Sequence, residues 1–360
     1  MSTKKKSSKK KNKALSPQLR VLLVGLLSVV IWMIGNFAFK GWVYLSDNKL
    51  SNFTSKVDFY VYPDMTADQV IEQISLQTKV KRPASLARAF RNHHVDELMK
   101  PGHYVLRPEQ TSAYAARMIN NRWQTPVKVT LSGTMRLKNE IARKISNQLL
   151  IDSASVHRAL NDEKLLAKYG FKPSTVFALI IPDTYEMYWT ESMEEFLDRQ
   201  KKAYDAFWTE ERVAKARKQG LTKLQASIVA SIVKGESNYE AEFPKIAGVY
   251  LNRLHKGMKL QADPTVAFCY DYKVNRILNK MLEFDSPYNT YKHAGLPPGP
   301  IYVPTKACLE AVLNPETSQG YLYFCADPSF NGSHRFAVSY TDHLHNARAF
   351  QAALNARGKK

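Results

Sequence analysis

An uninterrupted apolar run, VLLVGLLSVVIWMIGNFAF at positions 21–39, constrains this chain more than any other feature. At about 1.5 Å per residue, a helix of this length crosses most of a hydrocarbon core of roughly 30 Å. The run is longer than the apolar core of a secretory signal, and no clear small-residue cleavage site follows it. A lysine tract precedes it, which a buried core helix would not require. We therefore predict a transmembrane helix over 21–39.

The charge distribution orients this helix. Residues 1–20 carry eight of the 52 Lys and Arg and no acid, so +12 of the formal charge of +20 belongs to the other 340 residues. A basic flank stays in the cytoplasm. We predict a cytoplasmic tail over 1–20, a tether over 40–56, and a protein of the inner (plasma) membrane whose remaining chain lies outside the cytoplasm. That location excludes nucleic acid as a partner despite the basic charge.

The chain after the tether predicts two α+β domains. A strand, a turn and an amphipathic helix recur three times, at 57–74, 102–119 and 127–145, with Thr66 and Thr111 as helix caps. We assign 57–150 to a small α+β module. Residues 151–350 form a second mixed domain: mainly helical at first, then a strong helix from 221, a loop-rich region, a strand pair and a final helix. A basic tail occupies 351–360.

The cysteines and histidines do not indicate a cofactor. Cys269, Cys308 and Cys325 allow at most one disulfide, and their pairing is left open. Neither these cysteines nor the C-terminal histidines have the spacing of a metal site. We predict no metal and no cofactor.

Glu236 is the strongest catalytic candidate. At 100° per residue it falls on the apolar stripe of the helix that begins near residue 221, four residues beyond Ile232 and seven beyond Val229. An apolar wall raises the pKa of a carboxyl, because desolvation penalises the charged form. A carboxyl that keeps its proton at neutral pH can act as a general acid. The alternative is a glutamate that pairs with a lysine or turns to solvent.

The polar and aromatic residues that follow Glu236 in the sequence are of the types that bind sugars. Hydrogen-bonding side chains occur over 249–266, and two tyrosines with two polar residues precede a Pro and Gly loop over 286–301. The alternative is a structural loop with satisfied turns. The candidate substrate-binding residues are Asn252, Gln261, Asp263, Thr265, Tyr288, Asn289, Thr290 and Tyr291.

Four ordered segments resemble the endolytic murein transglycosylase (YceG-like) family: IPDTYEMYW at 181–189, ASIVKGES at 230–237, NRLHKGMKLQADPTV at 252–266 and YNTYKHAGLPPGPI at 288–301. The resemblance implies that Glu236 is the catalytic residue and that 57–150 is LysM-like. Many members have a charged residue and Lys before this glutamate and Thr after it. This chain has Lys234, Gly235 and Ser237 there.

The resemblance implies a lytic transglycosylase that cuts the β-1,4 bond between N-acetylmuramic acid and N-acetylglucosamine within nascent peptidoglycan strands. The products would end in 1,6-anhydro-muramic acid, and cleavage would limit strand length. Membrane-bound peptidoglycan synthases are expected partners, besides the glycan strands and the bilayer. Two alternatives stay open: a hydrolytic muramidase that uses Glu236 with Asp263, and a LysM-like wall-binding scaffold without turnover.

Overall fold

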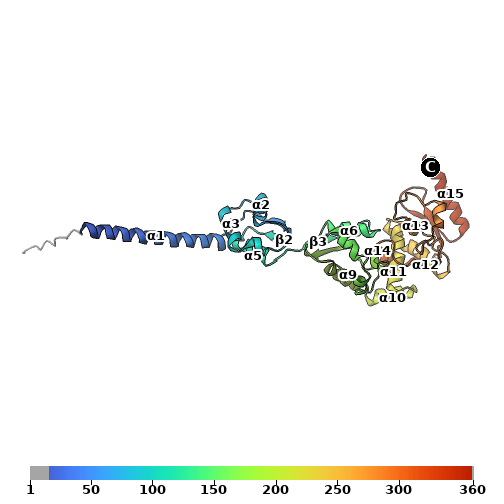
Figure 1. Ribbon diagram of the computed structural model, residues 1–360. Coiled ribbons are helices and arrows are strands. Elements are labelled where there is room, and N and C mark those ends of the chain that lie inside the picture. The colour runs from blue at the N-terminus through green and yellow to red at the C-terminus, as the bar shows by residue number, and fades with distance from the viewer. Residues whose placement is uncertain (1–15, 359–360) are drawn as a thin grey trace, which may run out of the picture. The chain divides into compact units, whose positions relative to one another are not determined.

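The computed structural model describes residues 16–358 and has a mixed α+β fold (Figure 1). The chain divides into two compact units, Met1–Thr125 and Pro126–Lys360. The predicted cytoplasmic tail lies outside the described residues over positions 1–15, as do positions 359 and 360 of the C-terminal tail.

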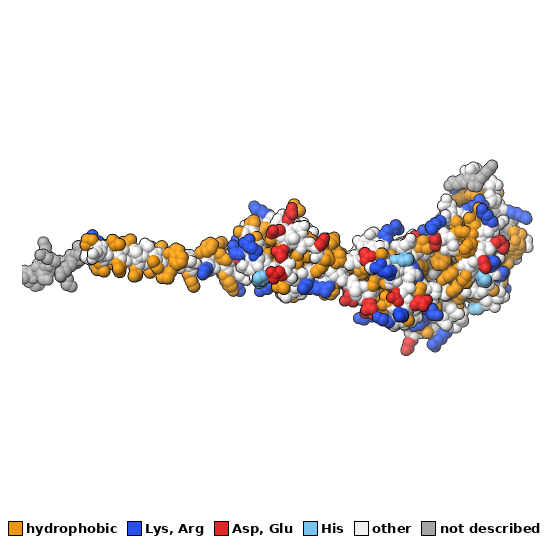
Figure 2. Space-filling model, viewed as in Figure 1, with side chains coloured by type: hydrophobic (Ala, Val, Ile, Leu, Met, Phe, Trp, Pro, Cys, Tyr) orange, Lys and Arg blue, Asp and Glu red, His pale blue; other side chains and the backbone are white. Residues whose placement is uncertain are grey.

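The first unit begins with a long apolar helix, α1 (Pro17–Asn48). Ser16 caps its N-terminus and Pro17 occupies the first turn, where a missing N–H costs no hydrogen bond. Its most apolar part is not buried anywhere in the protein, and by length and composition it qualifies as a membrane span. Apolar side chains cover this helix along its length (Figure 2). The helix contains the predicted span and extends beyond it at both ends.

The prediction of a tether over 40–56 is wrong. Residues 40–48 continue α1, and Ser46 and Asp47 at its C-terminal end are buried. Asn52 and Phe53 are fully buried as well. The error arose because short polar stretches look alike in sequence whether they are solvated or docked against a folded unit.

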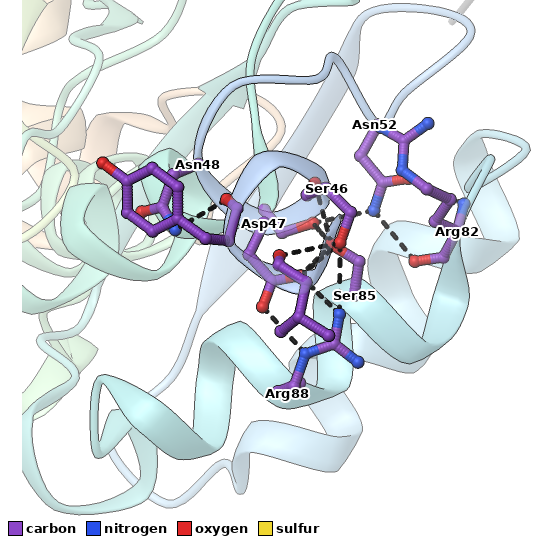
Figure 3. Close-up of polar contacts among 10 residues, drawn as sticks. Ser46, Asp47, Asn48, Asn52, Arg82, Ser85 and Arg88 are labelled. Atoms are coloured by element: carbon purple, nitrogen blue, oxygen red, sulfur yellow. Dashed lines mark hydrogen bonds and ion pairs between the residues drawn. The ribbon is translucent and has the colours of Figure 1, made fainter. Parts of the chain in front are cut away.

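A buried polar network fixes the end of α1 to the helices α3 (Pro83–Asn92) and α5 (Ser112–Asn120) (Figure 3). The Asp47 carboxylate accepts hydrogen bonds from Arg88 Nε at 2.8 Å, Arg88 Nη2 at 2.6 Å and Ser85 Oγ at 2.7 Å. Asn52 Nδ2 donates to Ser112 Oγ at 2.8 Å. The network satisfies charges and hydroxyls that would otherwise be costly to bury.

The rest of the first unit follows the predicted strand and helix pattern. Strands β1 (Val57–Val61) and β2 (Gly102–Leu106) pair antiparallel, with Val57 opposite Leu106. The remaining helices are α2 (Ala67–Gln77) and α4 (Val95–Leu98). The predicted caps are confirmed: Thr66 forms a capping box with Gln69, and Thr111 accepts from the Tyr114 amide.

The third strand and helix copy belongs to the second unit, so the division lies at residue 125 rather than near 150. Strand β3 (Val127–Thr130) pairs antiparallel with β4 (Thr184–Met187), more than fifty residues along the chain. Helix α6 (Lys138–Ser146) contributes Ile141 and Ile145 to the core of that unit. The local pattern of this copy matches the other two, but its strand finds a partner in the later sequence.

The second unit is mainly helical around α11 (Lys223–Glu236), which packs against α12 (Phe243–His255) and α14 (Lys306–Leu313). The predicted C-terminal strand pair is confirmed as β5 (Tyr323–Ala326) and β6 (His334–Ala337). The final helix, α15 (Tyr340–Ala356), continues into the segment expected as a tail from 351. The other elements are α7 (Ser153–Ala159), α8 (Glu163–Ala167), η1 (Val176–Ala178), α9 (Met193–Phe207), α10 (Glu210–Lys218), η2 (Glu240–Glu242), α13 (Asp263–Cys269) and η3 (Asn279–Glu283).

Replacing Asp47 with Ala is expected to loosen the first unit by roughly 2–4 kcal/mol, because Arg88 and Ser85 lose their buried acceptor. Hydrogen exchange of the full chain in detergent, read over α3 and α5, measures this change. The control is Glu97→Ala, which removes an exposed carboxylate from the same unit and is expected to cost less than about 1 kcal/mol. Equal protection of α3 and α5 in both variants would contradict a stabilising role for the network.

Candidate active site

Glu236 is the last residue of α11, where that helix opens onto a cavity. Thr222 begins the helix with a capping box to Gln225, and every residue from 226 to 233 is buried. The helix is thus held rigidly over its length, while the Glu236 side chain is partly exposed. The core packing of α11 therefore places one carboxyl at the cavity wall.

Tyr250 of α12 contacts the carboxyl directly. Its hydroxyl donates a hydrogen bond to Glu236 Oε1. The Tyr250 ring is buried and packs edge-on against Phe324 of β5, with ring centroids 6.0 Å apart. Burial and the nearby Glu236 raise the pKa of the Tyr250 hydroxyl, so it stays a donor. Glu236 Oε2 is left as the oxygen that can carry and release a proton.

The pKa of Glu236 is raised from its usual 4.5 to about 7, mainly because burial penalises the charged carboxylate. The hydrogen bond from Tyr250 lowers this pKa, the negative charge of Asp263 raises it, and Arg253 lowers it. The carboxyl also lies at the C-terminal end of a helix, whose dipole disfavours a negative charge. At neutral pH a large fraction of Glu236 is therefore protonated, as a general acid requires.

Three adjoining hollows share Glu236 in their walls. They have volumes of about 410, 500 and 620 Å³. The first lies towards α12 and the β5–β6 pair, the second towards α13 and residues 272–277, and the third towards residues 237–239 and 326–334. The carboxyl thus borders a surface that extends away from it in more than one direction, as an extended polymer requires.

Helix α13 approaches α11 closely beside the carboxyl. A Cβ on Gly235 would lie 2.6 Å from Pro264 Cβ, so in this backbone arrangement only glycine fits without a shift. Gln261 adopts a left-handed conformation, with φ of 49°, just before α13. The close approach of Gly235 and Pro264 brings Asp263, the first residue of α13, into the same hollows as Glu236.

Three of the predicted binding residues line the first cavity: Gln261, Asp263 and Tyr291. The side chains of Gln261 and Asp263 are exposed. Tyr291 donates a hydrogen bond from its hydroxyl to Asp263 Oδ1 at 2.6 Å. These three present amide, carboxylate and aromatic groups next to Glu236, a combination suited to a sugar.

The other five predicted binding residues do not line the hollows that Glu236 borders. Thr265, Asn289 and Thr290 are buried: the two threonine hydroxyls lie 2.8 Å apart, and Asn289 Nδ2 donates to Leu282 O and Phe284 O. Asn252 Nδ2 donates to Tyr321 O at 3.0 Å, and Tyr288 packs on Phe268. Four of these five side chains thus hydrogen-bond within the protein, and Tyr288 packs on a neighbouring ring.

The cavity also contains residues outside the predicted binding set. Tyr250 and Arg253 lie on α12, and Tyr323 and His334 come from the β5–β6 pair. His334 Nδ1 bonds Glu242 Oε2 at 2.8 Å, which holds β6 beside η2. Tyr250 and Arg253, beside Asn252 in the mainly apolar helix IAGVYLNRL, were the available signal.

Among residues 16–358 no group of His, Cys, Asp and Glu is arranged to hold a metal ion. The three cysteines are free thiols, and Cys308 is buried. The first cavity is lined by carboxyl, phenol and guanidinium groups, by the imidazoles of His334 and His343, and by the Cys325 thiol.

Replacing Glu236 with Gln is expected to stabilise the fold at alkaline pH. A carboxyl whose folded pKa exceeds its unfolded pKa contributes stability below about pH 4.5 and loses it as the pH rises through about 7. The neutral amide avoids this loss, so the variant should gain roughly 1–3 kcal/mol over the wild type at pH 8.5 and little at pH 4.5. Urea unfolding at both pH values, with the exposed Glu240→Gln as control, checks it. If the wild type and Glu236→Gln have the same free energy of unfolding at pH 8.5, the pKa of Glu236 is not raised.

Replacing Tyr250 with Phe is expected to raise the pKa of Glu236 further, because the lost hydrogen bond stabilised the carboxylate. Infrared titration of the carboxyl band, assigned by comparison with Glu236→Gln, measures the pKa. Tyr323→Phe removes a hydroxyl from the same cavity that does not bond Glu236, and serves as the control. An unchanged or lowered pKa in Tyr250→Phe would show that the contact does not favour the carboxylate.

Comparison with known proteins agrees with this fold. A model of the YceG-like family matches residues 59–349. The chain is 32% identical over 208 residues to a Bacillus subtilis (strain 168) protein named endolytic murein transglycosylase, covering 58% of this chain and 52% of that protein. It is 29% identical over 209 residues to a protein of the same name from Streptococcus pneumoniae serotype 2, covering 56% and 37%. The matches span about half, or less, of these relatives.

A solved structure of a YceG-like protein from Listeria monocytogenes is also similar. It superposes with a TM-score of 0.52 at 26% identity and covers 81% of this chain and 99% of that one. The family model accounts for most of the chain: it covers the first unit from residue 59 onward, nearly all of the second unit and every residue of the candidate site. This chain is therefore a member of the YceG-like family.

Proposed function

We propose that this chain is a membrane-anchored lytic transglycosylase that cuts within peptidoglycan glycan strands, with Glu236 as its general acid and base. The observation that carries the proposal is the Glu236 carboxyl, with a pKa of about 7, at the junction of three hollows. The name shared by the curated relatives supports the substrate and the reaction.

The reaction begins with a proton. Glu236 donates it from Oε2 to the oxygen of the β-1,4 bond between N-acetylmuramic acid and N-acetylglucosamine, and the C1–O bond of the muramyl residue breaks. The N-acetylglucosamine side leaves as an alcohol. The muramyl C1 becomes an oxocarbenium-like centre, and Glu236 is left as a carboxylate.

The same carboxylate then acts as a base. It accepts the proton of the muramyl C6 hydroxyl while that oxygen attacks C1, which closes a 1,6-anhydro ring and restores the protonated acid. Because the nucleophile belongs to the substrate, the attack is intramolecular and needs neither water nor a second carboxylate. The hydrogen bond from Tyr250 and the charge of Arg253 stabilise the carboxylate between the two steps.

The extended shape of the site supports cleavage inside a strand rather than at its end. Hollows continue from Glu236 both towards residues 272–277 and towards residues 326–334, so sugar units on both sides of the cut bond have room. A LysM-like role for the first unit, which would hold glycan, belongs to the same proposal.

The apolar helix supports a location at the inner membrane with the catalytic unit outside the cytoplasm. A site tethered there meets strands as they emerge from membrane-bound synthases, so cleavage would set the length of nascent strands. The synthases are proposed as partners because they would lie in the same membrane.

Asp263 supports the alternative of a hydrolytic muramidase, because it lines two hollows with Glu236 and its charge raises the Glu236 pKa. Hydrolysis needs a second carboxylate across the sugar to activate water. Asp263 accepts the Tyr291 hydroxyl and begins α13, roles that need no substrate. The reaction products separate the two mechanisms.

Wild-type protein in detergent is expected to shorten purified glycan strands and to leave 1,6-anhydro-muramyl ends, read by mass spectrometry. Glu236→Gln should lower the rate at least about 100-fold, because proton donation is lost, while circular dichroism stays unchanged. Glu240→Gln, which alters an exposed neighbour, should keep full activity. Reducing ends would instead establish hydrolysis, and strands that bind but never shorten would establish a wall-binding scaffold.

A further inference from the structure

Arg253 is a buried cation in the wall of the cavity that holds Glu236. It lies on α12, three residues after Tyr250, and only 8% of its surface is exposed. A guanidinium is charged at every pH a protein meets. Burying that charge is costly unless something compensates for it.

The protein groups that hold Arg253 are all neutral. Nε donates to Leu322 O at 2.6 Å and Nη1 to Leu260 O at 2.7 Å, with longer contacts of 3.5 Å from Nη1 to Lys259 O and Gln261 Oε1. Across residues 16–358 no carboxylate lies within ion-pair distance of it. Arg88, Arg199 and Arg212, by contrast, each pair with an acid. These contacts hold the Arg253 guanidinium in place, but they do not neutralise its charge.

Glu236 cannot serve as its counter-ion when the substrate binds. Arg253 acts on Glu236 through space, but Glu236 must be protonated, and so uncharged, when it meets the substrate. His343, in the same wall, is neutral as well, since burial and then the charge of Arg253 lower its pKa. Asp263, the other carboxyl that lines this cavity, accepts the Tyr291 hydroxyl and forms no ion pair with Arg253 within residues 16–358. In the state that binds substrate, the Arg253 guanidinium therefore has no direct carboxylate partner.

The geometry leaves one nitrogen of Arg253 for a ligand. Nε and Nη1 are committed to carbonyls, so Nη2 is the nitrogen without a hydrogen-bond partner in the part of the chain described here. The Tyr323 ring lies 5.2 Å from the guanidinium carbon, and His343 stacks on that ring at 5.4 Å. Together they form a flat wall with a cation at its edge.

We propose that Arg253 binds a carboxylate of the glycan strand beside the bond to be cut, and so selects muramyl strands over neutral N-acetylglucosamine polymers. The inference rests on the proposed function and names the substrate group that its site recognises. The carboxylate has two sources: the lactyl group of a muramyl residue without a peptide, or the peptide stem of a substituted one. Both offer a carboxylate oxygen to Nη2 of the guanidinium.

Binding to the full chain carrying Glu236→Gln tests this without cleavage. Four substrates are compared by titration calorimetry in detergent. Two are uncapped: strands with intact stems, and strands stripped of stems to free the lactyl carboxylate. The other two are the same strands with their carboxylates capped as methyl amides. Capping is expected to weaken binding at least about tenfold, as loss of a charge-assisted hydrogen bond does. Equal affinity for capped and uncapped strands overturns the proposal. If capping weakens binding of the stripped strands, the carboxylate is that of the lactyl group. If it weakens binding only of the strands with intact stems, the carboxylate belongs to the peptide stem.

Variants assign the effect to the residue. Arg253→Lys keeps a charge but loses the fixed guanidinium, so it should weaken binding of uncapped strands about tenfold and leave capped strands unchanged. Arg199→Lys, at an arginine already paired with Glu191, should change neither. If Arg253→Lys fails to fold, the capped and uncapped comparison decides alone. Wild-type protein that binds uncapped strands selectively but never cuts them would defeat the proposed function and retain this inference.

Discussion

The contact between the Glu236 carboxyl and the Tyr250 hydroxyl is the interaction on which the rest of the site depends. It joins the end of α11 to the middle of α12, and both helices owe their positions to the apolar core of the second unit. The core holds the carboxyl where desolvation keeps its proton, and the phenol limits that effect by stabilising the anion. In the proposed mechanism Glu236 releases and regains a proton within one reaction, and such a group needs this balance.

The sequence predicted the elements whose signals are local. Helical periodicity alone placed Glu236 on the apolar face of its helix, and the caps at Thr66 and Thr111 needed only the residues beside them. Pairings between distant segments could not be read in this way. The strand at 127–130 has the same pattern as the earlier copies, yet its partner at 184–187 decides which unit it joins.

The binding residues show the same limit. Polar side chains of a loop look alike in sequence whether they face a ligand or brace the loop itself, and burial decides between the two. Thr265 and Thr290 bond each other inside the protein, while Gln261, a few residues away, is exposed in the cavity. Tyr250 escaped notice because its role comes from packing between helices, which no spacing rule encodes.

The docking of α1 has a mechanical consequence. Ser46 and Asp47 are buried against α3 and α5, so the apolar helix joins the first unit through buried hydrogen bonds and an ion pair instead of a loose connection. Turning the helix about its own axis must turn that unit with it, and a change in its tilt must carry the unit through the same angle. Bilayer thickness affects the tilt of a spanning helix. If α1 spans the membrane, the thickness would therefore determine which face of the first unit is turned away from the lipid.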